Sequence, residues 1–194
     1  MKNTRKGFTF IELIIAAAIS SLVLVGVFGI LLTSNKQLDV IHAKMSLEES
    51  SREALFKMAQ EIRQTSNNKI TNNFGTPDVN AVQQTNTLIF IVPVPVPNAA
   101  SLVDVNFDPL WADSIQYSLD EATNQILRTS TNLATNVTQQ AVLADDVTAL
   151  AFSRKTAAPE LITITVSTQR TLSDGRNVPE TPMQMTAQAE ARNP

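Results

Sequence analysis

An apolar run near the N-terminus constrains this chain more than any other feature. Residues 13–32 are twenty positions without a charged side chain. A helix rises about 1.5 Å per residue, so a segment of this length crosses the roughly 30 Å hydrocarbon core of a bilayer. The run therefore predicts a membrane-spanning helix, which extends back to Phe8 with Glu12 as its one charged residue.

A short basic leader precedes this helix. Residues 1–7 contain three cations and no acid, namely Lys2, Arg5 and Lys6. Positive charges beside a membrane helix tend to stay in the cytoplasm. We therefore expect a cytoplasmic N-terminus and export of the rest of the chain.

Glu12 needs a partner in such a segment. Moving an unpaired carboxylate from water into lipid costs about 2.5–3.5 kcal/mol near a helix centre and less towards its ends. A positive charge supplied after processing is the best candidate for that partner. Thr9 and Glu12 also have the spacing of a capping box, in which both side chains satisfy free amides of the first turn, and the two roles are compatible.

Two simpler interpretations compete for this segment. A cleaved secretory signal peptide has a shorter apolar region, about 7–15 residues, followed by a small-residue cleavage site. Here the small residues 16–18 lie in the middle of the run, and strong hydrophobicity resumes after them. A plain signal anchor explains the hydrophobicity but explains neither Glu12 nor the Gly7–Phe8 junction.

The junction from Lys6 to Leu13, Lys-Gly-Phe-Thr-Phe-Ile-Glu-Leu, resembles the leader and cleavage signature of type IV pilins, type II secretion pseudopilins and competence pseudopilins. The resemblance implies that a membrane-embedded prepilin peptidase cuts between Gly7 and Phe8 and methylates the new amine of Phe8. It also implies that Glu12 acts in assembly. An ammonium on Phe8 would attract Glu12 of a laterally packed neighbour, because charge pairs are stronger in a medium of low dielectric than in water.

The helical pattern continues beyond the membrane segment to about residue 64. Apolar residues spaced three and four apart predict a stripe that packs on a soluble domain: Leu38, Ile41, Met45, Leu55, Ala59 and Ile62. Gly26 and Gly29 weaken the helix by about 1 kcal/mol each relative to alanine. We expect four segments: a leader (1–7), a transmembrane or filament-core helix (8–33), its amphipathic continuation (34–66) and a soluble β-rich domain (67–194).

The soluble part has the pattern of strands. Apolar or alternating runs predict strands at 87–92, 114–119, 125–129, 140–143, 147–153, 161–168 and 183–191. Loops are expected at 72–77 and 133–140, and a turn at Asp174–Gly175. Pro93, Pro95 and Pro97 remove donors from one strand edge, which favours an edge strand or a polyproline stretch. A long N-terminal helix followed by antiparallel strands is an α+β fold, and it is also the pilin architecture.

Composition argues against several function classes. Of 15 basic residues the leader holds three, which leaves 12 against 18 acidic residues, a balance unsuited to nucleic-acid binding. The chain has no cysteine, so disulfides and thiolate metal sites are excluded. His42 is the one histidine, and no nucleotide-binding or zinc motif is present. We therefore expect neither an enzyme nor a cofactor.

Loop acids offer oxygen ligands of the kind that calcium prefers: Asp104, Asp108, Asp113, Asp145 and Asp146. Their spacing does not match an EF-hand loop, so solvated acids are the expected role and no metal site is predicted.

Residues 143–152, 51–55 and 61–64 resemble, more weakly than the leader, the J-class minor pseudopilins and the W-class minor pilins. The absence of the C-terminal cysteine pair of many major pilins also favours a minor subunit. The sequence thus predicts a structural subunit of a type IV pilus, type II secretion or DNA-uptake filament in the bacterial inner membrane. Its partners would be the prepilin peptidase and other subunits. The alternatives are a signal-anchored periplasmic binding or sensory module and, with no clustered polar site to support it, a membrane-tethered hydrolase.

Overall fold

The computed structural model describes residues 9–71, 82–93, 111–155 and 158–192. Several sequence predictions fall outside these residues: the leader, Gly7 and Phe8, the loop at 72–77, Pro95, Pro97, Asp104 and Asp108. The chain divides into two units, residues 1–42 and residues 43–194.

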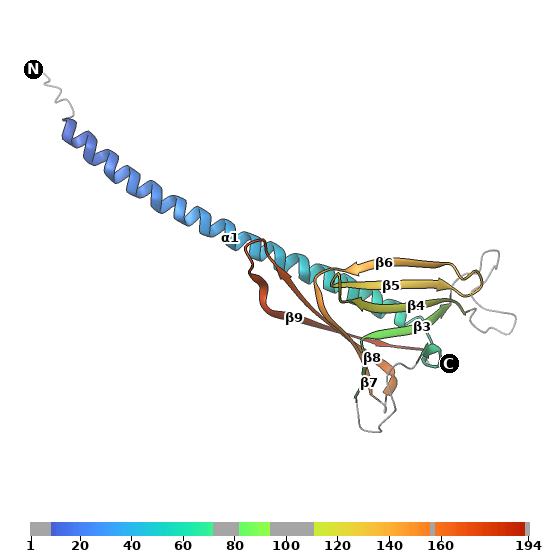
Figure 1. The fold of residues 1–194 in the computed structure, drawn as a ribbon. Helices are drawn as coiled ribbons and strands as arrows, with labels where there is room; N and C mark the ends of the chain where they lie inside the picture. The colour runs from blue at the N-terminus through green and yellow to red at the C-terminus, as the bar shows by residue number, and fades with distance from the viewer. Residues whose placement is uncertain (1–8, 72–81, 94–110, 156–157, 193–194) are drawn as a thin grey trace, which may run out of the picture. The chain divides into compact units, whose positions relative to one another are not determined.

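A single helix, α1 (Phe10–Ile62), runs through 53 residues of both units and is drawn from blue to cyan in Figure 1. It confirms the long helix expected from the sequence. Gly26 and Gly29 lie inside it without breaking it. Its last turn tightens, because Gln64 N donates to Glu61 O and Thr65 N to Ile62 O, three residues back rather than four. A short 3₁₀ turn, η1 (Asn67–Lys69), follows.

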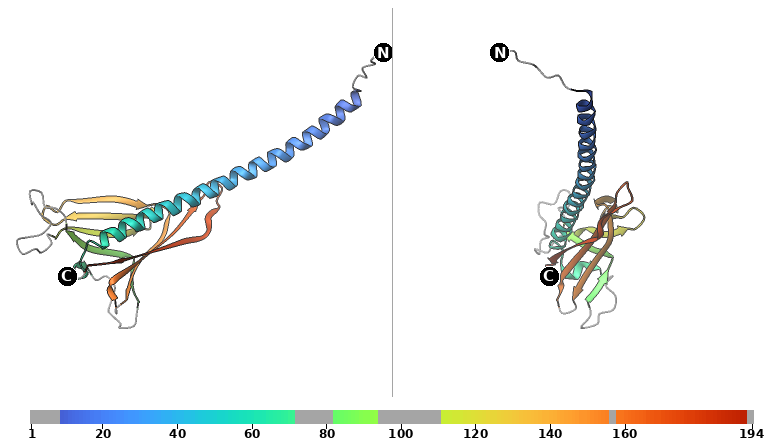
Figure 2. Two further views of the ribbon diagram at one scale, coloured as in Figure 1. Left: turned by 180° about the vertical axis from the view of Figure 1, so that it is seen from behind. Right: turned by 90° about the vertical axis from the view of Figure 1, so that its left-hand side faces the viewer.

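The strands form two antiparallel sheets, and the α+β prediction is confirmed. The five-stranded sheet has the order β1 (Ile70–Thr71), β3 (Thr87–Pro93), β4 (Trp111–Asp120), β5 (Gln125–Asn132) and β6 (Thr138–Ala144). The four-stranded sheet has the order β2 (Val82–Thr85), β7 (Val147–Lys155), β8 (Ala158–Thr171) and β9 (Asn177–Glu190). Figure 2 shows the cyan part of α1 lying against these sheets within the second unit.

Six of the seven predicted strands lie within a strand of the structure, and the seventh, 183–191, runs one residue past the end of β9 (Asn177–Glu190). The loop predicted over 133–140 was too long, because β6 already begins at Thr138. A tighter connection suffices, since the Asn132 side chain accepts hydrogen bonds from the amides of Ala134 and Thr135 and Asn136 adopts a left-handed φ of 54°. The turn at Asp174–Gly175 is confirmed, with Gly175 at φ 80°.

The edge position predicted for the proline strand holds at Pro93, the one proline of that stretch within the described residues, although β3 as a whole is not an edge strand. β3 lies between β1 and β4. β1 pairs only with Phe90 and Ile89, so Pro93 lies beyond its reach and pairs with Trp111 on the other side. The missing amide proton of Pro93 therefore interrupts no ladder towards β1.

One core is shared by α1 and both sheets. Phe90 and Tyr117 of the first sheet lie with ring centroids 5.8 Å apart, and Tyr117 and Phe152 of the second sheet lie 6.5 Å apart. All three side chains are fully buried. This row of rings joins the two sheets beneath the helix.

The predicted helix stripe is correct only at its C-terminal end. Leu55, Ala59 and Ile62 are buried, whereas Leu38, Ile41 and Met45 are about half exposed or more, at 47%, 52% and 62%. At 3.6 residues per turn the buried face continues from Leu55 through Ser51 and Leu47 to Ala43. Ser51 and Ala43 lie on that face, so its sequence does not show an unbroken stripe of large apolar residues.

Arg192, which follows β9, is hydrogen-bonded to the residues at the end of the helix. Arg192 N donates to Thr65 O at 2.9 Å, and Asn67 N donates to Arg192 O at 3.0 Å. The Thr65 hydroxyl donates to Ile91 O of β3 at 2.6 Å. The helix end, β3 and the residues after β9 are therefore held together at one point.

Candidate assembly site on the N-terminal helix

Glu12 lies in the first turn of α1 and closes a capping box with Thr9. Thr9 N donates to Glu12 Oε2 at 2.8 Å, and the Thr9 hydroxyl donates to the same oxygen at 3.0 Å. Glu12 N donates back to the Thr9 hydroxyl at 3.4 Å. The capping prediction is confirmed, and the helix starts where Thr9 and Glu12 satisfy amides that have no partner in the first turn.

The capping box leaves half of the carboxylate available. Both bonds from Thr9 to the carboxylate use Oε2, and among the described residues Oε1 of Glu12 has no hydrogen-bond or ion-pair partner. A carboxylate accepts at both oxygens. Glu12 can therefore cap its own helix and still accept a charged donor from outside the subunit.

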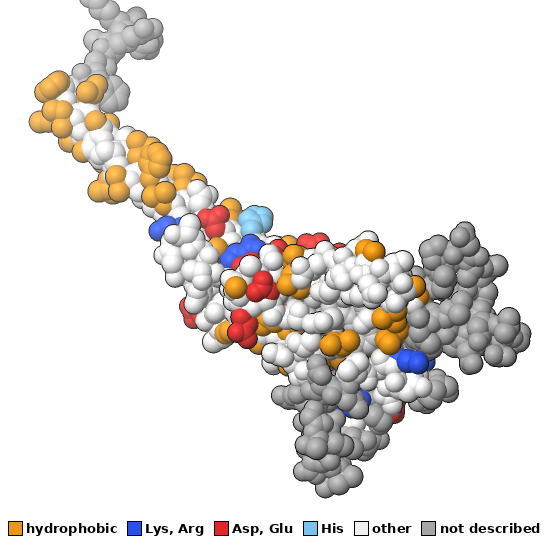
Figure 3. Space-filling view, turned by 45° about the vertical axis from the view of Figure 1, so that its right-hand side comes forward, with side chains coloured by type: hydrophobic (Ala, Val, Ile, Leu, Met, Phe, Trp, Pro, Cys, Tyr) orange, Lys and Arg blue, Asp and Glu red, His pale blue; other side chains and the backbone are white. Residues whose placement is uncertain are grey.

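The helix around Glu12 is covered by nothing within the described chain. Every described residue from Thr9 to Asp39 is exposed, and orange apolar side chains lie along the face of this part of α1 that Figure 3 shows. Apart from adjacent residues and the backbone of the helix itself, no heavy atom of the described residues lies within 4 Å of the position that a Cβ would take at Gly26 or Gly29. Among the described residues, α1 is the one helix long and apolar enough to cross a membrane.

Exposing so large an apolar surface to water is unfavourable, because burying each methylene group contributes about 0.8 kcal/mol of favourable free energy. It fits a lipid bilayer or the helices of other subunits. The small residues of this segment leave room for a neighbouring helix to approach closely.

The chain matches the family model of the prokaryotic N-terminal methylation motif over residues 2–28. This motif is the signature of type IV pilins and pseudopilins, and it confirms the resemblance carried by the junction between Lys6 and Leu13. A search among curated proteins found no match.

The match, which covers residues 2–28, points to a class of protein. The motif indicates a type IV pilin-like precursor that is processed by prepilin peptidase and assembles with other pilin subunits in the membrane. The apolar part of α1 fits a single transmembrane anchor. Type IV pilin family proteins are structural subunits rather than enzymes.

A polar cluster that was not predicted from the sequence joins α1 to the first sheet. Arg128 Nε donates to both oxygens of Glu61 at 3.0 Å, and the Tyr117 hydroxyl donates to Glu61 Oε2 at 2.5 Å. Tyr117 and Arg128 are opposite each other on β4 and β5. The hairpin register, in which Asp120 pairs with Gln125, brings these two residues opposite each other. A sequence reading would have found the pair only by assigning that register.

The cluster is partly buried, and this shifts its pKa values. Burial, together with the hydrogen bond to Glu61, raises the pKa of Tyr117. Burial acts to lower the pKa of Arg128, but the hydrogen bond and charge of Glu61 outweigh it and the pKa is raised. Tyr117 therefore stays neutral and Arg128 stays charged, which holds Glu61 of the helix against the sheet.

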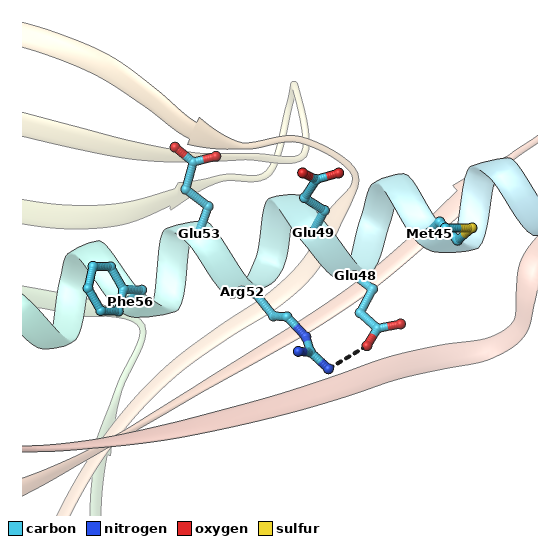
Figure 4. Close-up of a pocket in the computed structure, with 6 residues that line it drawn as sticks. All are labelled: Met45, Glu48, Glu49, Arg52, Glu53 and Phe56. Atoms are coloured by element: carbon cyan, nitrogen blue, oxygen red, sulfur yellow. Dashed lines mark hydrogen bonds and ion pairs between the residues drawn. The ribbon is translucent and has the colours of Figure 1, made fainter.

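A shallow groove follows the exposed side of α1 in the second unit. It is lined by Met45, Glu48, Glu49, Arg52, Glu53 and Phe56 and is drawn in Figure 4. Arg52 donates to Glu48 at 2.7 Å, the dashed line of Figure 4. All six residues come from the helix itself, so the groove is a feature of its surface rather than a cavity.

The other acids considered from the sequence have partners where the structure describes them. Asp146 pairs with Arg170 at 2.7 Å, Asp145 accepts from Gln125 at 2.7 Å, and Asp113 accepts from Asn132 at 2.9 Å. Within the described ranges no group of three or more His, Cys, Asp or Glu side chains could hold a metal ion. His42 lies exposed on α1.

Proposed function

We propose that the protein is a minor pilin or pseudopilin, a structural subunit of a type IV pilus, type II secretion or DNA-uptake filament. The observation that carries this proposal is Oε1 of Glu12, which has no partner among the described residues and lies one turn into an uncovered apolar helix that begins within the methylation motif. The weaker resemblance to J-class pseudopilins and W-class minor pilins supports a minor rather than a major role. The chain carries out no catalysis, and the chemistry is performed on it by the peptidase.

In this proposal the peptidase cuts between Gly7 and Phe8 and methylates the amine of Phe8. Residues 1–7 are removed, residues 8–33 form the membrane or filament-core helix, residues 34–66 continue it, and residues 67–194 form the soluble domain. Before cleavage the N-terminus is cytoplasmic and the helix spans the inner membrane, because Lys2, Arg5 and Lys6 precede it.

Glu12 then pairs with the Phe8 amine of a neighbouring subunit. Two unit charges about 4 Å apart attract by about 4 kcal/mol at an effective dielectric constant near 20. This attraction offsets the cost of about 2.5–3.5 kcal/mol for holding a carboxylate in lipid. The pair fixes the axial position of each entering subunit, because the two charges meet at only one offset of the helices.

Cleavage is tested with Gly7→Ala in the native membrane, followed by N-terminal sequencing. We expect the wild type to begin at methylated Phe8 and the variant to retain its leader and migrate as a heavier band. A signal-anchored binding or sensory module, the alternative, would keep Met1 in both proteins.

Pairing is tested separately with Glu12→Ala. We expect this variant to be cleaved normally and to be depleted from the filament fraction. Glu53→Ala, which removes another exposed acid of α1, is the matched control and should assemble normally. Normal incorporation of Glu12→Ala would reject the pairing role.

A further inference from the structure

Among the described residues, nothing pairs with the outer edge of the five-stranded sheet. Within that part of the chain β6 is the last strand in the sheet order and pairs only with β5, as its outer position in Figure 1 shows. Residues 138–142 are all exposed. An open edge presents a row of unpaired amides and carbonyls, which are a template for another strand.

The two sheets have four edge strands, and three of them are unsuited to further pairing. β1 has two residues and β2 has four, so each offers few hydrogen bonds. β9 is long, but it carries Pro179, Glu180, Pro182 and Glu190. Short strands, prolines and charges are the devices with which proteins protect sheet edges.

β6 has none of these protective devices. Its seven residues, Thr-Gln-Gln-Ala-Val-Leu-Ala, include no proline and no charge. Three exposed large apolar side chains lie on it or just before it, Leu133, Val137 and Val142. Apart from these, the exposed large apolar side chains described in the second unit are Met45 and Phe56 of α1.

The hydrogen-bond pattern identifies the groups that face outward. Asn132 N donates to Val137 O at 2.9 Å, which makes these two residues a hydrogen-bonded pair. Such pairs alternate along an antiparallel ladder, so Gln139 and Ala141 bond to β5. Thr138, Gln140 and Val142 therefore direct their amides and carbonyls to the open edge.

We propose that two copies of this chain associate through their β6 strands, which pair antiparallel about Gln140. In this register Gln140 faces its own counterpart, and Thr138 of each copy faces Val142 of the other. The inference goes beyond the proposed filament role and does not depend on it.

The chemistry of the edge favours a second copy as its occupant. Residues 138–144 carry no charge, so two copies meet without the like-charge repulsion that separates charged edges. The Gln140 amide both donates and accepts, which makes it complementary to itself. An isologous contact of this kind closes at two copies, and so it joins subunits side by side instead of extending a chain of them.

The first test is a disulfide cross-link in the full chain in its membrane. The protein has no cysteine, so Gln140→Cys introduces the only thiol. Opposed residues on paired strands lie about 5.5 Å apart, the separation that a disulfide requires. Gln184→Cys is the matched control, because Gln184 is exposed on the protected edge strand β9.

We expect mild oxidation to give at least about tenfold more dimer from Gln140→Cys than from Gln184→Cys, because only the former thiols would lie in disulfide geometry. The same yield is expected in the Gly7→Ala background, which keeps the leader. This background separates the edge contact from filament assembly, so failure of the proposed function would leave the cross-link intact. Equal yields from the two cysteines would overturn the proposal.

A second test checks the register by charge exchange. One tagged copy carries T138C with Q140K, and the other carries V142C with Q140E. Opposite charges at the centre should allow the cross-link between the two tags. Replacing Q140E by Q140K in the second copy should reduce it to the Gln184→Cys level, because like charges would face each other. A cross-link that is insensitive to these charges would rule out the Gln140 register.

Discussion

The Tyr117 hydroxyl donates a hydrogen bond of 2.5 Å to Glu61 Oε2 and so ties the first sheet to the helix. Arg128 completes the arrangement, with its side chain 22% exposed and that of Glu61 16% exposed. The helix thus contacts this sheet through a charged cluster as well as through apolar side chains.

Removing the carboxylate should destabilise the domain. Glu61→Ala takes away the acceptor of both partners, and hydrogen bonds to charged groups contribute about 1.5–3 kcal/mol. We expect a loss of unfolding free energy in that range, measured by urea unfolding of the full chain in detergent. Glu48→Ala is the control, because it breaks an ion pair whose side chains are 41% and 69% exposed, and it should cost no more than about 0.5 kcal/mol. Equal losses would contradict the structural role of the cluster.

Tyr117 should make the domain sensitive to alkali. It is the only tyrosine in the chain, and burial together with Glu61 raises its pKa above the ordinary value of 10.0. An unfolded chain ionises near that value while the folded chain does not. This contribution to stability is therefore complete below about pH 10 and is lost as the pH rises further. Ultraviolet absorbance should show tyrosinate only as the domain unfolds, and a folded protein that ionises Tyr117 near pH 10 would disprove the assignment.

Truncating a ring of the buried core to alanine should destabilise the domain far more than truncating a ring in the groove on the helix. Phe90 is fully buried and Phe56 is 69% exposed, so the same substitution tests two environments. Phe90→Ala should cost about 3–5 kcal/mol of unfolding free energy through the cavity that it leaves. Phe56→Ala should stay within about 0.5 kcal/mol of the wild type. A comparable loss at both positions would mean that the exposed side of α1 is covered.

The two roles of Glu12 can be separated by a pair of variants. Glu12→Gln keeps an oxygen that can accept from Thr9 but removes the charge, so we expect normal cleavage and strong depletion from the filament fraction. Thr9→Ala weakens the cap by about 1 kcal/mol but keeps the carboxylate, so incorporation should remain close to that of the wild type. Equal depletion of both variants would show that Glu12 acts through the cap alone.

The sequence predicted most of the secondary structure because its signals are local. The membrane-length run, the absence of proline before Pro77 and the turn at Asp174–Gly175 each depend on neighbouring residues. β1 and β2 were missed because two and four residues are too short for a period-two pattern to be recognised.

The predictions from the sequence failed where tertiary packing determines which side chains are buried and which come into contact. Ser51 is fully buried on α1, and a polar residue on the buried face moved the predicted stripe to the exposed side at Met45. The cluster of Glu61, Tyr117 and Arg128 joins a helix to two strands, and only the hairpin register relates its members in sequence. The cap of Thr9 and Glu12 was found because the two residues are three positions apart.

The contact between Thr65 and Arg192 has a consequence for biosynthesis. The ribosome makes the helix early and β9 late, so the groups of β8 that pair with β9 have no partner while translation continues. Long-range pairing of this kind is slow, because the chain must close a large loop before any contact forms. The pairing edge of β8 is therefore uncovered until β9 has been made, and the nascent polypeptide must be kept from aggregating through that edge in the interval.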